Sequence, residues 1–295
     1  METNGARGGW RWGLLGAVAP VTWGSVYFVT LHWIPPEEPL TAALLRALPA
    51  GLLLLAVRRR LPRGAWWWRA GVLGVLNCGA FFVLVYLASK LLPTAVAAML
   101  MSLSPLVMML LAWALLNERP TVRRLAGGAL GVLGVVLMLA SSIGPIDGWG
   151  VISSLTAMGM YALGSVLAKR WSGHVDAVTA SAWQLTAGGL LLLPIALAFE
   201  GAPSLVDAEA VVAYAYVSVI ATALAFVCWF GALRRLHAGQ VGLLGLLNPV
   251  TGVLLGMLAG GELLSMLQWL GIAAVLAGVL LGQVLGSGRG RAGSA

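Results

Sequence analysis

Charged side chains are scarce in this chain. Asp, Glu, Lys and Arg make up only 9% of its 295 residues, whereas apolar residues make up 60%. A soluble domain carries about 25% charged residues. A chain of this composition has more apolar surface than a soluble fold of the same length can bury. The sequence therefore excludes a soluble protein and predicts one that lies in a membrane.

Residues that carry enzyme or metal chemistry are also few. The chain has ten acidic residues, three His and two Cys, and the His residues are scattered along it. No zinc-ligand spacing, phosphate-binding loop or nucleophile elbow is present. These absences disfavour an enzyme, and they leave no motif for a metal ion or a cofactor.

Long apolar runs divide the chain into ten segments that are each long enough to cross a bilayer. About 20 residues span the hydrocarbon core, and short turns rich in Gly and Pro separate the runs. We predict an all-α membrane protein with ten transmembrane helices, which lie near residues 12–30, 39–57, 66–88, 93–116, 122–143, 148–168, 176–199, 210–233, 238–260 and 264–286.

The second half of the chain repeats the first. Two copies of five spans, an odd number, must enter the membrane in opposite directions. We therefore predict an inverted repeat, with the first copy at residues 1–145, the second at 146–288 and a short cytoplasmic tail at 289–295. The positions that align are Trp23 with Tyr161, Arg46 with Gln184, Tyr86 with Phe230, Lys90 with Arg234, Ser104-Pro105 with Asn248-Pro249, Glu118 with Glu262, Gly127 with Gly271 and Gly134 with Gly278.

The distribution of basic residues indicates the orientation. If the N-terminus lies in the cytoplasm, every Lys and Arg falls on the cytoplasmic side except Lys90, which is outside, and Arg46, which lies well within a span. Lys and Arg are retained in the cytoplasm during insertion, so both termini are predicted to be cytoplasmic. The formal net charge of +8 then reflects short loops beside anionic lipid headgroups. The predicted partners are the lipid bilayer and a small organic solute, with no nucleic acid.

The order of these motifs resembles that of a known family. Trp23-Gly24-Ser25, Arg46, the repeated ends of spans three and eight, the repeated prolines and the two glutamates together resemble the EamA-type branch of the drug/metabolite transporter superfamily. The resemblance covers nearly the whole chain, once in each half. It implies a ten-helix carrier of the inner (plasma) membrane, commonly an exporter of amino acids or other small metabolites, with a central cavity. It does not imply a particular substrate.

Two prolines near the middle of spans four and nine predict flexible points. Pro105 and Pro249 each remove a backbone hydrogen bond and bend the helix, so the carbonyls of Met101 and Gly245 are predicted to lose their helical partners. In hydrocarbon such groups need water, a side chain or a ligand, and the nearest side chains are Ser102, Ser104 and Asn248. Two interpretations stay open: a packing kink that is satisfied locally, or a polar floor of the cavity. Either one gives the helix a place to flex during alternating access.

Arg46 is the only charge well inside a span. Burying a cation there costs at least a few kcal/mol, so Arg46 is expected to face a wet cavity or a partner. It could bind a substrate carboxylate, or it could be a structural donor to backbone carbonyls. Gln184, its counterpart in the repeat, is neutral.

Aromatic and polar residues complete the predicted substrate site. Aromatic side chains can form the apolar wall of a pocket, and amides and hydroxyls can bind the polar parts of a solute. With Arg46 and Gln184, the predicted substrate-binding residues are Trp23, Ser25, Asn77, Phe81, Ser104, Tyr161, Trp183, Trp229 and Asn248.

Glu118 and Glu262 each end a span just before the next one begins. A carboxylate there can act in gating, or it can bond the free N–H groups of the following helix and complement its dipole. We favour the structural role.

Gly127 with Gly131 and Gly278 with Gly282 place small residues four apart on spans five and ten, which predicts close helix packing. One use of that packing would be a homodimer.

The sequence as a whole predicts a secondary transporter that exports amino acids or related small metabolites by alternating access between the two repeats. Three alternatives stay open: uptake in place of export, an integral membrane enzyme, and a membrane scaffold that transports nothing.

Overall fold

The computed structural model describes residues 4–34, 38–140, 144, 146–201, 207–261 and 263–283. Every regular element in this part of the chain is helical. Within these described ranges, ten helical stretches are long and apolar enough to cross a membrane, and they agree with the predicted limits to within a few residues. These spans, numbered one to ten, are Gly9–Trp33, Pro39–Arg58, Trp66–Leu91, Thr94–Leu116, Val122–Leu139, Gly148–Trp171, Ala177–Phe199, Ala208–Leu233, Ala238–Ala259 and Met266–Gln283.

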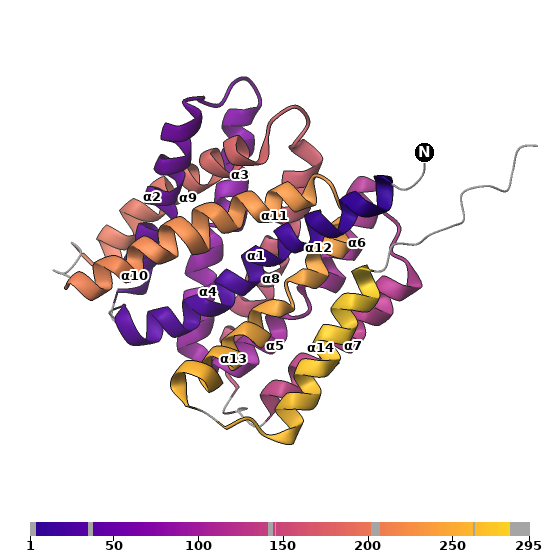
Figure 1. The fold of residues 1–295 in the computed structure, drawn as a ribbon. Coiled ribbons are helices and arrows are strands. Elements are labelled where there is room, and N and C mark those ends of the chain that lie inside the picture. The colour runs from indigo at the N-terminus through magenta and orange to yellow at the C-terminus, as the bar shows by residue number, and fades with distance from the viewer. Residues whose placement is uncertain are drawn as a thin grey trace, which may run out of the picture.

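Six spans are single helices, and Figure 1 shows them packed with the other four into one bundle. They are α1 (Asn4–Trp33), α2 (Pro39–Arg58), α7 (Val122–Leu139), α8 (Gly148–Trp171), α9 (Ala177–Phe199) and α14 (Met266–Gln283). Several begin at a residue whose side chain accepts a hydrogen bond from an N–H of the first turn, which satisfies a backbone donor that has no helical partner. These capping residues are Thr121, Asp147, Asp176 and Asp207, the last of which caps α10 in span eight.

Four spans are interrupted in or near the middle. Span three consists of α3 (Trp66–Asn77) and α4 (Gly79–Leu91), and span four of α5 (Thr94–Met101) and α6 (Ser104–Leu116). Span eight consists of α10 (Ala208–Ser218), the π-helical turn η2 (Val219–Leu224) and α11 (Ala225–Leu233), and span nine of α12 (Ala238–Leu244) and α13 (Leu247–Gly260). These four spans pair as three with eight and four with nine in the repeat, so the interruptions occupy equivalent places in the two copies.

Spans five and ten pack against each other within the chain (Figure 1). A Cβ atom on Gly127 would lie 2.5 Å from the carbonyl oxygen of Gly278, and one on Gly134 would lie 2.6 Å from that of Gly271. The two backbones therefore touch along their glycine faces, as the spacing of these residues predicted. These contacts lie within one chain, so they account for the spacing of the glycines without a second copy, and the suggested homodimer stays a prediction.

Helices α2 and α9 form the second close pair, and this one is fixed at both ends. Gly51 lies so near α9 that a Cβ atom on it would come within 2.4 Å of the Thr186 nitrogen. At one end Arg58 forms an ion pair with Asp176. At the other end the carboxylate of Glu200 accepts hydrogen bonds from the backbone nitrogens of Leu40 and Thr41, at 2.8 and 2.7 Å. Because α2 and α9 belong to different repeats, this pair joins the two copies.

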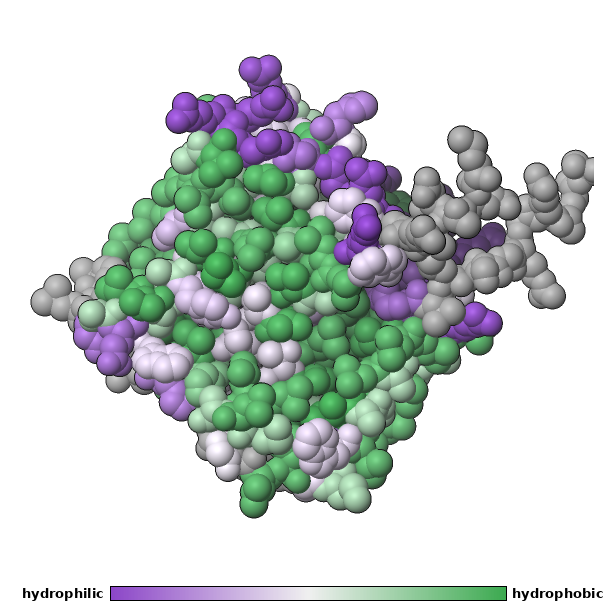
Figure 2. Space-filling model, viewed as in Figure 1, coloured by the Kyte–Doolittle hydropathy of each residue, from purple (hydrophilic) through white to green (hydrophobic). Residues whose placement is uncertain are grey.

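The start of α1 and the end of α14 lie together, at what we call the terminal face. A Cβ atom on Gly13 would be 3.7 Å from the Gln283 side chain, and Gln283 donates a hydrogen bond to the Gln240 carbonyl in α12. Figure 2 shows that the visible surface is mostly apolar, with hydrophilic residues gathered at the helix ends. This distribution suits a bundle whose sides face lipid.

Candidate functional site

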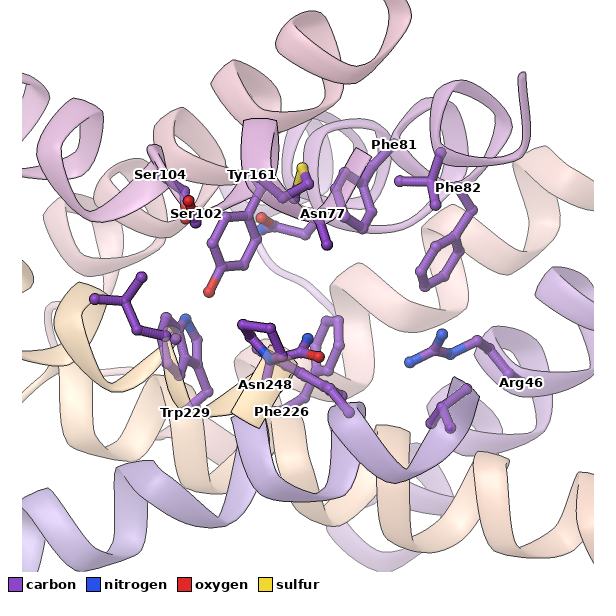
Figure 3. Close-up of a pocket in the computed structure, with 18 of the residues that line it drawn as sticks. Arg46, Asn77, Phe81, Phe82, Ser102, Ser104, Tyr161, Phe226, Trp229 and Asn248 are labelled. Carbon is purple, nitrogen blue, oxygen red and sulfur yellow. The ribbon is translucent and has the colours of Figure 1, made fainter. Parts of the chain in front are cut away.

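A cavity of about 250 Å³ lies between the two repeats, and residues from seven spans line it (Figure 3). Most of the lining is apolar or aromatic. The lining residues are Trp23, Val26, Arg46, Asn77, Phe81, Phe82, Val85, Ala98, Met101, Ser102, Ser104, Tyr161, Phe226, Trp229, Phe230, Gly245, Leu246, Asn248 and Pro249.

The helix interruptions bring polar groups to this cavity. Asn77 stands where α3 ends, Ser102 stands between α5 and α6, and Gly245 stands between α12 and α13. Irregular backbone is tolerated at membrane depth where it lines a cavity or is buried in protein. The prolines of spans four and nine fall in the first turns of α6 and α13, where a missing N–H breaks no helical bond.

The structure corrects part of the prediction about the two prolines. The carbonyl of Gly245 does not lose its backbone partner, because the nitrogen of Asn248 donates to it at 3.1 Å in a tighter turn. Ser102 does not serve Met101 either, since its hydroxyl donates to the carbonyl of Met99 at 2.6 Å. At the break before Pro249, the backbone of span nine thus satisfies the Gly245 carbonyl. Before Pro105, Met101 lines the cavity together with Ser102 and Ser104.

The aromatic wall is centred on Trp23. Its ring lies 5.3 Å from that of Trp229 and 6.2 Å from those of Tyr161 and Phe226, mostly edge to face. Tyr161 in turn lies 6.1 Å from Phe81. Trp23 and Tyr161 are counterparts in the repeat, so their contact joins the same position of the two copies across the cavity.

Arg46 is the only charged residue that lines the cavity in the described part of the chain. Its Nε donates to the hydroxyl of Thr222 at 3.1 Å, and its guanidinium carbon lies 4.7 Å from the centre of the Phe82 ring. Figure 3 shows the guanidinium directed into the cavity, below Phe82. Thr222 belongs to η2, so this π-helical turn supplies the hydroxyl that fixes the orientation of the arginine.

A buried pair of amides stands at one side of the cavity. Asn77 lines the cavity and donates from its Nδ2 to the Oε1 of Gln184 at 2.9 Å. Gln184 is fully buried behind Asn77 and does not line the cavity. Within the described residues, Asn77 Oδ1 and Gln184 Nε2 have no hydrogen-bond partner. Arg46 and Gln184, although equivalent in the repeat, therefore have different surroundings.

Two further residues of the predicted site lie away from the cavity. The hydroxyl of Ser25 contacts that of Tyr216 at 2.6 Å, and Trp183 donates from its indole nitrogen to the carbonyl of Arg60 at 2.7 Å. The structure brings together the other predicted substrate-binding residues, which are Trp23, Arg46, Asn77, Phe81, Ser104, Tyr161, Trp229 and Asn248. Sequence reasoning missed Phe82 and Phe230. The signal for Phe230 was its spacing of four from Phe226, which puts both on one face of α11.

Glu118 lies at the terminal face, where it joins three helix ends. It forms an ion pair with Lys169, and its Oε2 accepts a hydrogen bond from the nitrogen of Ala238 at 2.7 Å. Nδ1 of His237 is 3.5 Å from the same oxygen. The expected role was to bond the N–H groups of the following helix, α7, but Thr121 caps that helix. Glu118 instead bonds the start of α12, in the other repeat. Glu262 lies outside the described residues.

The surroundings of Glu118 favour its charged form. Partial burial opposes ionisation, but the contacts with His237 and Lys169, the Ala238 hydrogen bond and the charge of Lys169 outweigh it. Together they lower the pKa of Glu118 from 4.5 to about 2. Glu118 is therefore an anion at neutral pH and contributes to the contact between the repeats.

Comparison with known proteins identifies the family to which this architecture belongs. The EamA-like transporter family matches residues 10–140 and 148–282, so one copy of the family's domain falls in each half of the chain. The chain belongs to the EamA-like transporter family. This membership confirms the resemblance seen in the sequence motifs, and it makes the chain a membrane transporter.

Individual relatives agree with the family. The chain is 36% identical over 267 residues to the protein PecM of Dickeya dadantii, with 90% of each chain covered. It is 28% identical over 268 residues to the uncharacterized inner membrane transporter YedA of Escherichia coli, with 88% of this chain and 87% of YedA covered. A crystal structure that is 22% identical superposes with a TM-score of 0.79 and covers 93% of this chain, which shows a shared fold. This EamA-like protein is a multi-pass protein of the inner membrane, and relatives named as transporters agree with the expectation that it is not an enzyme.

Proposed function

We propose that this EamA-like protein exports amino acids or related small metabolites that carry a carboxylate. The observation that supports this most directly is the lining of the cavity. Among the described residues, it combines one guanidinium, that of Arg46, with aromatic walls, and it contains no acidic side chain. A cation surrounded by apolar groups attracts an anion far more strongly than it does in water. A guanidinium also suits a carboxylate, because two of its donors can bind both oxygens.

The neighbours of Arg46 support a binding role. Thr222 and Phe82 hold the guanidinium from two sides and fix its direction, which reduces the entropy lost when a solute binds. The neutral groups Tyr161 and Asn248 can then accept hydrogen bonds from an amine or hydroxyl of the solute. A cavity of about 250 Å³ is small beside the pockets of drug-sized ligands, which favours a small metabolite.

Transport would proceed by alternating access between the repeats at 1–145 and 146–288, with both termini in the cytoplasm. The different packing of two equivalent helices supports this. All seven residues of α12 are buried, whereas in its counterpart α5 only Ala95 and Val96 are buried. The α12 end of the cavity, at the terminal face, is thus the tightly packed one. Export would require this end to open to the cytoplasm, which breaks the bond between Glu118 and Ala238.

Paired substitutions at Arg46 test the proposed site. The purified protein is reconstituted in vesicles, and the flux of carboxylate-bearing metabolites is compared with that of their amides. Arg46→Gln should reduce carboxylate flux about tenfold or more and affect the amides much less, since only the charged partner is lost. Arg46→Lys should recover part of the carboxylate flux.

Two results would count against the site. Arg46→Gln could reduce the flux of carboxylates and amides alike, or it could lower the amount of inserted protein, and either result would make Arg46 a structural donor.

The direction of transport is tested in cells loaded with the transported solute. Cells that produce the protein should retain less solute than cells that produce Arg46→Gln, and greater accumulation would indicate uptake.

A further inference from the structure

The connection between α2 and α3 carries a dense group of arginines that the transport mechanism does not use. Arg59, Arg60 and Arg63 are exposed, and Arg69 follows within the first turn of α3. The nearby acid, Asp176, is already bonded to Arg58. Figure 2 shows hydrophilic residues gathered at this tip of the molecule, above the apolar surface of α2 and α3. The tip therefore carries positive charge beside a surface that faces hydrocarbon.

Tryptophans fix the depth of this group in the membrane. Trp67 and Trp68 are 62% and 54% exposed, and such side chains prefer the boundary between headgroups and acyl chains. Trp68 packs edge to face against Trp171 of α8, with ring centres 5.0 Å apart. The guanidinium carbon of Arg69 lies 5.5 and 5.6 Å from the centres of these two rings. Arg69 is thus held beside tryptophans that prefer the level of the lipid headgroups.

The backbone of the connection is also held in place. The carbonyl of Arg60 accepts the hydrogen bond from the indole of Trp183. Arg59 adopts a left-handed conformation with φ of 52°, and its nitrogen bonds to the carbonyl of Leu55 at 2.7 Å. Side chains that project from a fixed backbone lose less entropy on binding than those of a mobile loop. The backbone contacts of Arg59 and Arg60 are therefore a feature beyond the positive charge that retains a loop in the cytoplasm.

We propose that Arg59, Arg60, Arg63 and Arg69, with the Trp68–Trp171 pair, form a binding site for the phosphate headgroup of an anionic phospholipid. Guanidinium groups bind phosphate oxygens in pairs, and basic pockets between transmembrane helices at this side of a membrane suit anionic lipids. The exposed tryptophans and the apolar flanks of α2 and α3 favour a lipid over a soluble phosphate, because they provide contacts for acyl chains.

Binding of defined lipids to the purified full-length protein tests this site. Phosphatidylglycerol and phosphatidylcholine are titrated in detergent, and bound lipid is counted by native mass spectrometry. The wild type should retain phosphatidylglycerol in preference to phosphatidylcholine. The triple variant Arg59→Gln, Arg60→Gln, Arg63→Gln should bind phosphatidylglycerol roughly tenfold more weakly or worse. The control is Arg119→Gln, Arg123→Gln, Arg235→Gln, which removes the same charge from exposed arginines elsewhere at the terminal face and should bind like the wild type.

A second variant separates the site from net charge. Trp68→Leu keeps every arginine but removes the ring contact with Trp171 and Arg69, and it should also weaken phosphatidylglycerol binding. Equal losses in the triple variant and its control, or equal binding of the two lipids by the wild type, would overturn the proposal. Displacement of the lipid by millimolar inorganic phosphate would overturn the lipid as the ligand. Correct folding is checked by each variant's thermal unfolding in detergent without added lipid.

Discussion

At the scale of single residues, the structure separates side chains that line the cavity from those that hold the repeats together. Arg46 belongs to the first kind and Glu118 to the second, although both are charged residues in or beside spans. The difference lies in their surroundings. Arg46 lines the cavity and contacts the Phe82 ring and the Thr222 hydroxyl, whereas a lysine, a histidine and a helix start surround Glu118.

Substitution of Glu118 tests its structural role. Glu118→Gln should lower the free energy of unfolding at neutral pH by about 2 kcal/mol, because the hydrogen bonds and the ion pair lose their charge. The pKa of Glu118 falls from 4.5 to about 2 on folding. Its contribution is therefore complete above about pH 4.5 and is lost as the pH falls toward 2. The gap between wild type and variant, measured by unfolding in detergent, should close over that range. Exposed Glu209→Gln serves as the control, and a gap that does not change with pH would contradict the role.

At the scale of helices, the positions of the spans could be predicted from the sequence, but their rotations could not. Apolar runs between turn residues predicted all ten spans, and midspan prolines predicted the breaks in spans four and nine. The break at Cys78 and the π-helical turn Val219–Leu224 contain no proline. At the break at Cys78, α9 packs closely, since a Cβ atom on Gly188 would lie 2.5 Å from the Cβ atom of Cys78. Ser25 and Trp183 were assigned to the cavity because a nearly uniform apolar span does not reveal which face points inward.

The two prolines are predicted to make spans four and nine flexible. The double variant Pro105→Ala, Pro249→Ala supplies two backbone N–H groups and allows each pair of half-helices to straighten. We expect normal insertion and a reduced transport rate in vesicles. The amount of protein in the membrane, measured on the same samples, is the control. A double variant that transports at the wild-type rate would limit both prolines to packing.

At the scale of the whole molecule, the two copies share one architecture but differ in packing. The pairs α7 with α14 and α2 with α9 join the copies through glycines. The fully buried α12 and the partly buried α5 are the equivalent elements that differ most. We therefore expect the glycine-packed pairs to stay together while α12 and α5 exchange their packing during transport.

Reporter fusions test the proposed orientation. Fusions after residues 35, 146, 204 and 262 should report an external location, and those after 62, 120, 173 and 236 a cytoplasmic one, because the basic residues are retained inside. One strong reversal among the interior loops would contradict the inverted repeat with cytoplasmic termini.

The central claim is that solute passes through the cavity between the repeats, and blocking that cavity tests it most directly. Ala98 lines the cavity on α5, and Ala98→Trp would fill much of a space of about 250 Å³. Leu110 lies in the same span but is 55% exposed on the side of the bundle, so Leu110→Trp adds a ring without entering the cavity. The measurement is the flux of a transported carboxylate in vesicles that hold equal amounts of each protein. The account predicts that Ala98→Trp abolishes flux and Leu110→Trp preserves it, and wild-type flux through Ala98→Trp would contradict it.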